Sequence, residues 1–296
     1  MLTQRLQRFQ REAGRRLVLG VPYFWLLVMT AIPALIILQF SISQLDVATL
    51  TKPWSMVEGV LNIRIDFNKY LFLFTDSLYL AAYLSSLKFA LLNTALCLFI
   101  AYPFAYFMAR SPESVRPSLL MAVMLPFWTS FLVRIYSWKG LLATNGVFNN
   151  AMMGLGLIHE PIHMLNTPFS LTLGMVYTYL PFMILPLYTT LQKMDVRLLE
   201  AALDLGATPW QAFWRITVPL SVNGIVAGSM LVFIPSIGEY VIPELLGGPE
   251  TLMIGRVLWD EFFGNNDWAM ASAVAAVMIL LILGPMAIFN KYQRAK

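Results

Sequence analysis

The chain has 296 residues, of which 58% are hydrophobic and only 12% are charged, with a formal net charge of +4. A soluble domain carries about 25% charged residues, so this composition excludes an ordinary soluble domain and indicates a chain that lies mostly in a lipid bilayer. The single cysteine, Cys97, excludes an intrachain disulfide and gives no set of thiolates for a metal.

Six segments are apolar over the roughly 20 residues that a helix needs to cross a bilayer. In chain order they are Leu17–Phe40, Phe89–Ala109, Pro117–Val133, Phe169–Leu191, Leu220–Leu246 and Trp268–Phe289. The first is about twice as long as the apolar core of a signal peptide, and we expect it to be retained. None alternates apolar and polar residues as a membrane β-strand does, so the sequence predicts an all-α membrane protein with six transmembrane helices.

Basic residues set the expected orientation, because lysine and arginine gather in cytoplasmic loops. With the N-terminus inside, 13 of the 20 lysines and arginines fall on the cytoplasmic side, and both termini are cytoplasmic. The predicted organisation is a basic cytoplasmic tail at residues 1–16, the first helix with an outer loop at 17–80, and the main transmembrane domain at 81–291. The arginines of the tail are interpreted as topology signals and not as a nucleic-acid site.

Between the fourth and fifth apolar segments lies a polar, helix-forming stretch, Glu200–Pro219. Ala201 and Ala202 are strong helix formers, and Gly206 can end a helix in the left-handed conformation. The pair Thr208-Pro209 is typical of the start of a second helix. The pattern predicts a helix–turn–helix on the cytoplasmic face, within the loop 192–219. Its Phe213, Trp214 and Ile216 would anchor the second helix; the alternative is an ordinary amphipathic connector.

This stretch resembles the EAA motif of ABC importer permeases: Glu-Ala-Ala, three residues, Gly, nine residues, Ile-x-Leu-Pro. The matching positions are Glu200, Ala201, Ala202, Gly206, Ile216 and Pro219, with Val218 in place of the usual leucine. In that family the loop is the coupling helix, which seats in a groove of the ATPase subunit. The resemblance therefore implies that these six residues couple the chain to an ATPase.

The rest of the chain resembles the permeases of polyamine importers, and the putrescine type more than the spermidine type. The similar stretches are Leu125–Tyr136, Gly228–Pro235, Gly238–Pro249 and Met253–Trp259. The resemblance implies a type I ABC importer permease in the bacterial inner membrane. It also implies a second permease chain, two ATPase subunits and a periplasmic polyamine-binding protein as partners.

The chain lacks a Gly-x-x-x-x-Gly-Lys-Ser/Thr phosphate loop. We therefore expect no catalytic residue and no cofactor in this chain, with ATP and magnesium bound by the partner ATPase subunits.

The fifth apolar segment contains ionisable residues, which are costly in a span and usually face a bundle interior or an aqueous path. Glu239 beside Tyr240 suits a diamine, with charge pairing for one ammonium and a cation–π contact for the other. The remaining candidates for the substrate pathway are Glu244, Trp128, Tyr177 and Tyr179. Two alternatives stay open: Glu239 bonds only to a neighbouring helix, or Glu244 lies at the outer interface.

Two functions of other classes also remain open. His159-Glu-Pro-Ile-His163 matches the zinc-protease signature His-Glu-x-x-His, but Pro161 disfavours the helix that this signature needs, so we predict no metal site. The second is an ion-coupled secondary transporter that uses Glu239 as its proton or cation site. That function leaves the helix–turn–helix unexplained.

Overall fold

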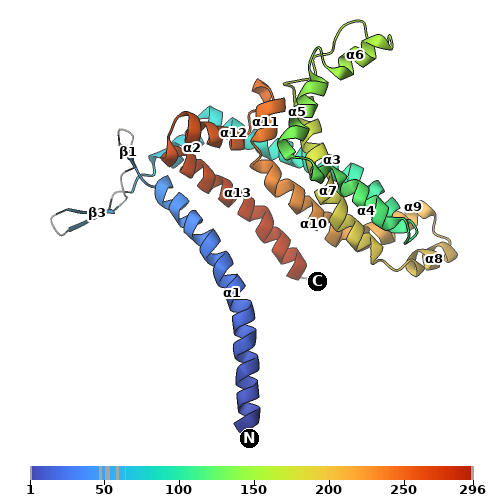
Figure 1. Ribbon diagram of the computed structural model, residues 1–296, viewed down its shortest axis with the longest axis horizontal. Helices are drawn as coiled ribbons and strands as arrows, with labels where there is room; N and C mark the ends of the chain where they lie inside the picture. Colours follow the sequence, from blue (N-terminus) through green and yellow to red (C-terminus); the bar gives the residue numbers. More distant parts are fainter. Residues whose placement is uncertain (1, 47–48, 51–53, 58–59, 64, 295–296) are drawn as a thin grey trace. The chain divides into compact units, whose positions relative to one another are not determined.

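The structure is a computed structural model that describes residues 2–46, 49–50, 54–57, 60–63 and 65–294. The chain folds into two units, one formed by Met1–Phe72 and Glu261–Val277 and the other by Leu73–Asp260 and Met278–Lys296. The described elements are predominantly helices, which confirms the all-α prediction (Figure 1).

The first unit starts with α1 (Leu2–Ser41), whose portion Leu17–Ser41 is long and apolar enough to cross a membrane. Two short antiparallel hairpins follow in the loop between α1 and α2. They are formed by β1 (Leu45–Asp46) with β2 (Thr49–Leu50), and by β3 (Trp54–Val57) with β4 (Val60–Ile63). Lys69, on α2 (Asn68–Thr75), donates a hydrogen bond of 2.5 Å to the carbonyl of Ser43 and so ties α2 to the residues that follow α1.

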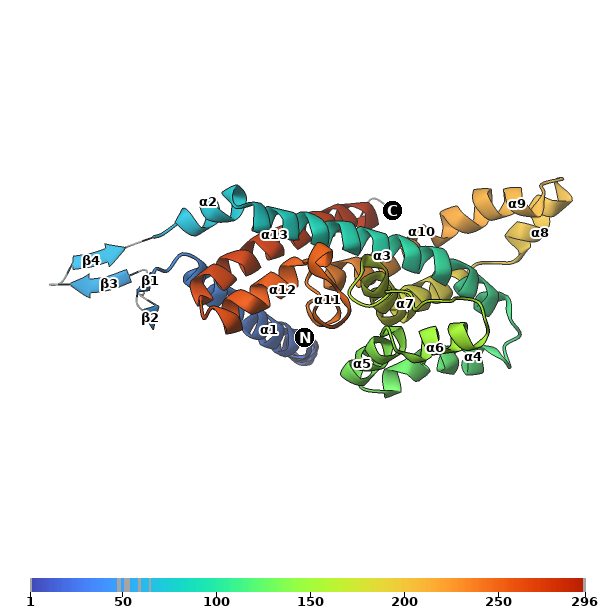
Figure 2. The same ribbon diagram turned by 90° about the horizontal axis from the view of Figure 1, so that it is seen from above.

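The second unit is built on three helices that lie side by side, α3 (Ser77–Arg110), α7 (Pro168–Gln192) and α10 (Val218–Ile237) (Figures 1 and 2). Small residues line their contacts, which lets membrane helices approach closely. A Cβ atom on Gly228 of α10 would lie 2.7 Å from the Sδ of Met183 on α7, so this position needs glycine. The core of this bundle joins Cys97, Ala101 and Ala105 of α3 to the large buried side chains of α7.

Among the described residues, five helices are long and apolar enough to span a membrane, and a sixth span results if one bent pair is counted together. The bent pair is the predicted third span, and here the structure corrects the prediction of a single helix over Pro117–Val133. The chain forms α4 (Arg116–Met124) and the short η1 (Leu125–Trp128), then turns by 85°. It continues as α5 (Phe131–Leu142) and α6 (Val147–Gly154). Ser130, with ψ of 137°, breaks the helix after the proline of η1.

The predicted fifth span, Leu220–Leu246, is also not one helix. Its main helix α10 ends at Ile237, and α11 (Val241–Leu246) follows after a break at Gly238–Tyr240. Pro235 lies one turn before the break and cannot donate a hydrogen bond to the preceding turn. Beyond α11 come η3 (Pro249–Thr251), α12 (Ile254–Trp259), η4 (Asp260–Gly264) and the last helix, α13 (Trp268–Arg294).

Candidate functional site

The helix–turn–helix predicted at Glu200–Pro219 is present as α8 (Arg197–Asp204) and α9 (Pro209–Ala212). Gly206 has φ of +86°, the left-handed conformation that was predicted. The amide of Gly206 donates to the carbonyl of Leu203, and the amide of Ala207 donates to that of Ala202. These two bonds form a Schellman motif that closes α8.

The second helix begins as the sequence predicts and runs directly into the membrane bundle. Thr208 caps α9 in a reciprocal capping box with Gln211. A wider turn, η2 (Phe213–Thr217), joins α9 to α10 without a break in the helical chain. The ring of Phe213 packs edge-on against Tyr102 and Tyr106 of α3, with centroids 5.5 and 6.0 Å apart. The turn η2 is therefore in contact with α3 and continuous with α9 and α10.

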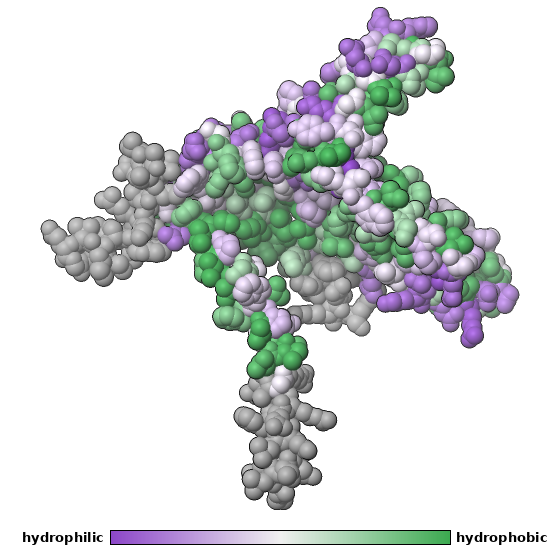
Figure 3. All heavy atoms as spheres, in the orientation of Figure 1, coloured by the Kyte–Doolittle hydropathy of each residue, from purple (hydrophilic) through white to green (hydrophobic). Residues whose placement is uncertain are grey.

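The α8–α9 segment exposes apolar side chains on an otherwise hydrophilic end of the unit. It lies at the ends of α7 and α10 remote from α11 (Figures 1 and 2), where the surface is mostly hydrophilic (Figure 3). Leu205 is 88% exposed and Trp210 is 69% exposed. Glu200 and Ala201 are exposed beside them. Such apolar groups within a polar rim are characteristic of a surface that binds another protein.

Glu239 lies in the break between α10 and α11 and is held from three directions. Its Oε2 accepts a hydrogen bond of 2.5 Å from the hydroxyl of Tyr179 on α7. Its Oε1 accepts from the backbone amides of Val241 and Ile242, at 3.1 and 3.4 Å. The carboxylate thus caps the first turn of α11, where free amides and the helix dipole favour negative charge. The half-buried Glu239 joins two spans and still reaches the surface.

The segment that follows Glu239 folds back as a hairpin of α11 and α12, which two buried serines hold against the bundle. The hydroxyl of Ser170 donates to the carbonyl of Leu246 at 2.6 Å, and the amide of Ile254 donates to the hydroxyl of Ser86 at 2.7 Å. A Cβ atom on Gly255 would lie 2.5 Å from the carbonyl oxygen of Gly238. The positions of these three residues were not predicted, since serine and glycine in apolar runs give no signal without their distant partners.

The other predicted pathway residues are not gathered around Glu239. Tyr240 stacks on Trp259 with ring centroids 4.4 Å apart, so the aromatic partner of the Glu239 carboxylate is Tyr179. Glu244 forms an ion pair of 2.7 Å with Arg256. Trp128 lies on η1 and is 76% exposed.

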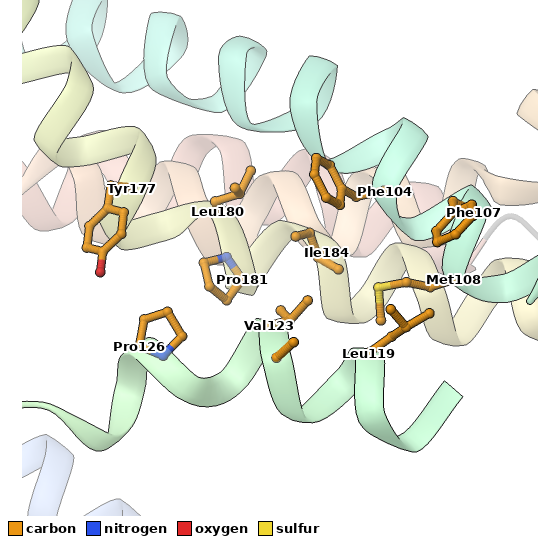
Figure 4. A pocket seen from close by; sticks show the side chains of 11 residues that line it. Phe104, Phe107, Met108, Leu119, Val123, Pro126, Tyr177, Leu180, Pro181 and Ile184 are labelled. Carbon is orange, nitrogen blue, oxygen red and sulfur yellow. The ribbon is translucent and has the colours of Figure 1, made fainter. Parts of the chain in front are cut away.

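Tyr177 lines an apolar cavity of about 320 Å³ between α3, α4 and α7. Figure 4 shows Val123 and Pro126 opposite Pro181 and Ile184 of α7. The Tyr177 hydroxyl is the only polar side-chain group in the lining. An ammonium group would find no carboxylate there, so this cavity does not suit a diamine.

The stretch His159–His163 lies in a loop, outside any helix, with both histidines exposed. Asn149 of α6 holds this loop through two hydrogen bonds with the backbone of Ile162. Among the described residues no group of three histidine, cysteine or acidic side chains could hold a metal ion. The zinc-protease geometry therefore does not form in this loop.

Comparison with known proteins shows which protein family this chain resembles. The family model described as "Binding-protein-dependent transport system inner membrane component" matches residues 101–294. The chain is 40% identical over 262 residues to the spermidine/putrescine transport system permease protein PotB of Salmonella typhimurium (strain SL1344), covering 88% of this chain and 87% of that protein. It is 38% identical over 282 residues to PotB of Haemophilus influenzae, covering 95% and 94%.

Among solved structures, the chain is similar to one in a bacterial alginate ABC transporter in complex with its alginate pentasaccharide-bound periplasmic protein. The TM-score is 0.67 at 20% identity, over 97% of this chain and 98% of that one. At this identity the likeness establishes the fold alone, which is that of an ABC importer permease.

Proposed function

Because the chain belongs to the family of binding-protein-dependent transport system inner membrane components, we propose that it is one permease subunit of an ATP-driven polyamine importer. The family is one of inner-membrane proteins, in agreement with the apolar helices. The observation that carries the proposal is the α8–α9 segment, which exposes an apolar surface and continues directly into α10.

The α8–α9 segment is the coupling element in this proposal. Two ATPase subunits bind ATP and magnesium. One of them binds the surface around Glu200, Ala201 and Ala202 and displaces it when the two ATPase subunits close together. The tight turn at Gly206 fixes the angle between α8 and α9. Ile216 and Pro219 lie where α9 passes into α10, so the displacement reaches the break at Glu239 through one helical chain.

The proposed substrate is a polyamine, and we favour putrescine over spermidine. The spermidine/putrescine transport named in the relatives supports this class, and so does a carboxylate placed at a broken span. Glu239 receives one ammonium, with Tyr179 orienting the carboxylate through its hydrogen bond. Tyr240 and Glu244 flank the path on α11, whereas Trp128 and Tyr177 take no direct part.

The chain supplies half of the pathway and a second permease chain supplies the other half. A periplasmic binding protein delivers the substrate to the side that bears α11 and α6. The α8–α9 side is cytoplasmic, as the distribution of lysine and arginine predicts, and both termini are cytoplasmic.

The test is ATP hydrolysis by the chain purified from native membranes with its associated subunits and reconstituted in lipid. Stimulation by the binding protein loaded with putrescine is the expected result. Co-purified ATPase activity that does not respond to any polyamine would support the assignment as an importer and refute the assignment of a polyamine substrate. A folded chain with no ATPase, whose transport fails on addition of an uncoupler, would instead establish an ion-coupled secondary transporter.

A further inference from the structure

Two arginines of the second unit, Arg110 and Arg134, have buried guanidinium nitrogens with no hydrogen-bond acceptor among the described residues, and Arg134 has two of them. The guanidinium of Arg134, on α5, packs over the rings of Phe127 and Phe131, with 5.3 and 5.9 Å to the centroids. Its Nε and Nη1 atoms are buried and have no hydrogen-bond acceptor. Aromatic faces attract a cation but accept no N–H bonds of ordinary strength. An arginine within a membrane domain is normally paired with an anion, so this site is incomplete in the single chain.

The described part of this chain does not supply the anion. Glu239 and Glu244, the two carboxylates of the predicted fifth span, are bound elsewhere. Glu239 is held by Tyr179 and the start of α11, and Glu244 is paired with Arg256. A cavity of about 250 Å³ lies beside Arg134 and is lined by hydroxyl and apolar side chains, among them Thr129 and Ser137, but by no acidic one. The described part of this chain therefore offers no carboxylate to Arg134.

The surface around Arg134 is rich in exposed aromatic and aliphatic side chains. Trp128 and Tyr136 are mostly exposed, and so are Leu132 and Val133 between them. Tryptophan, tyrosine and arginine are the residues that contribute most to binding at the centres of interfaces. We call Trp128, Leu132, Val133, Arg134 and Tyr136 the Arg134 face.

We propose that the Arg134 face is a contact with the second permease chain, and that a carboxylate of that chain accepts the guanidinium of Arg134. This rests on the proposed function, which requires such a chain. A carboxylate matches the planar fork of arginine with two parallel hydrogen bonds and neutralises its charge. The two aromatic rings keep water away from the pair, which makes the attraction stronger and the choice of partner more selective.

The first experiment locates the carboxylate. The intact complex with Arg134→Lys is treated with a carbodiimide, which joins the new amine to a neighbouring carboxylate as an amide while the reagent takes up the water released. Peptide mass spectrometry then identifies the joined residues. We expect a peptide that links position 134 to an acidic residue of the second permease chain. The matched control is Val133→Lys, which places the same amine on the next residue of the face and should give at least about tenfold less of that product.

A second measurement keeps the proposal testable if the lysine variant assembles poorly. Arg134→Gln should reduce the amount of second permease chain that co-purifies by at least about fivefold, while Lys139→Gln, which removes a charge from the same helix outside the Arg134 face, should leave it unchanged. Retention of the second chain at the native level by Arg134→Gln overturns the proposal. So does an amide to an acidic residue of this same chain, or an intact Arg134→Lys complex with no amide at all. In each of these cases ATP hydrolysis stimulated by the loaded binding protein would still support the importer, so the two proposals fail separately.

Discussion

The turn at Gly206 offers the sharpest test of the coupling role. Its φ of +86° is a conformation that other residues adopt at a cost of about 1–3 kcal/mol. No heavy atom lies within 4 Å of the position that a Cβ would take, so the cost of a substitution is purely conformational. Gly206→Val should carry the upper part of this cost, because a β-branched side chain is least suited to the left-handed region. A cost of about 2 kcal/mol reduces the population of the native turn relative to its alternatives by about 30-fold.

Gly206→Asn is the matched control, because asparagine tolerates the left-handed conformation and adds a side chain at the same exposed place. The assay is ATP hydrolysis by the reconstituted complex, stimulated by the loaded binding protein, together with the amount of ATPase subunit that co-purifies. We expect Gly206→Val to lower stimulated hydrolysis by about tenfold or more, and Gly206→Asn by less than about threefold. Equal and native coupling in both variants would refute the role of this turn.

Three further predictions concern the broken span, its packing and the loop His159–His163. Tyr179→Phe removes the 2.5 Å hydrogen bond to Glu239 and should weaken putrescine transport by about 10- to 150-fold, since a hydrogen bond to a charged group contributes about 1.5–3 kcal/mol; unchanged uptake kinetics would remove the pair from the pathway. Gly255→Ala places a Cβ against backbone and should destabilise the hairpin by about 1–3 kcal/mol, seen as a lower thermal midpoint of the complex. Gly140→Ala, which meets nothing within 4 Å, is its control and should not lower the midpoint. Glu160→Gln should leave uptake unchanged, because Glu160 lies in an exposed loop; loss of uptake would show that this loop takes part in transport.

Sequence alone determined the helical class and the helix–turn–helix at Glu200–Pro219, because both depend on local properties. A span is recognised by its own apolar length, and Gly206, Thr208 and Pro209 act on the backbone within one or two turns of themselves. For this reason the turn, its cap and the start of α9 were predicted residue by residue.

Only the tertiary structure decided where the spans break and which groups meet there. Composition could not distinguish a continuous span from two shorter helices, so the break after Trp128 was missed. The partner of Glu239 is a tyrosine 60 positions earlier in the chain, and the serine that holds α12 is 168 positions away. Such contacts are selected by the packing of helices and not by local preference, and so is the unpaired guanidinium of Arg134.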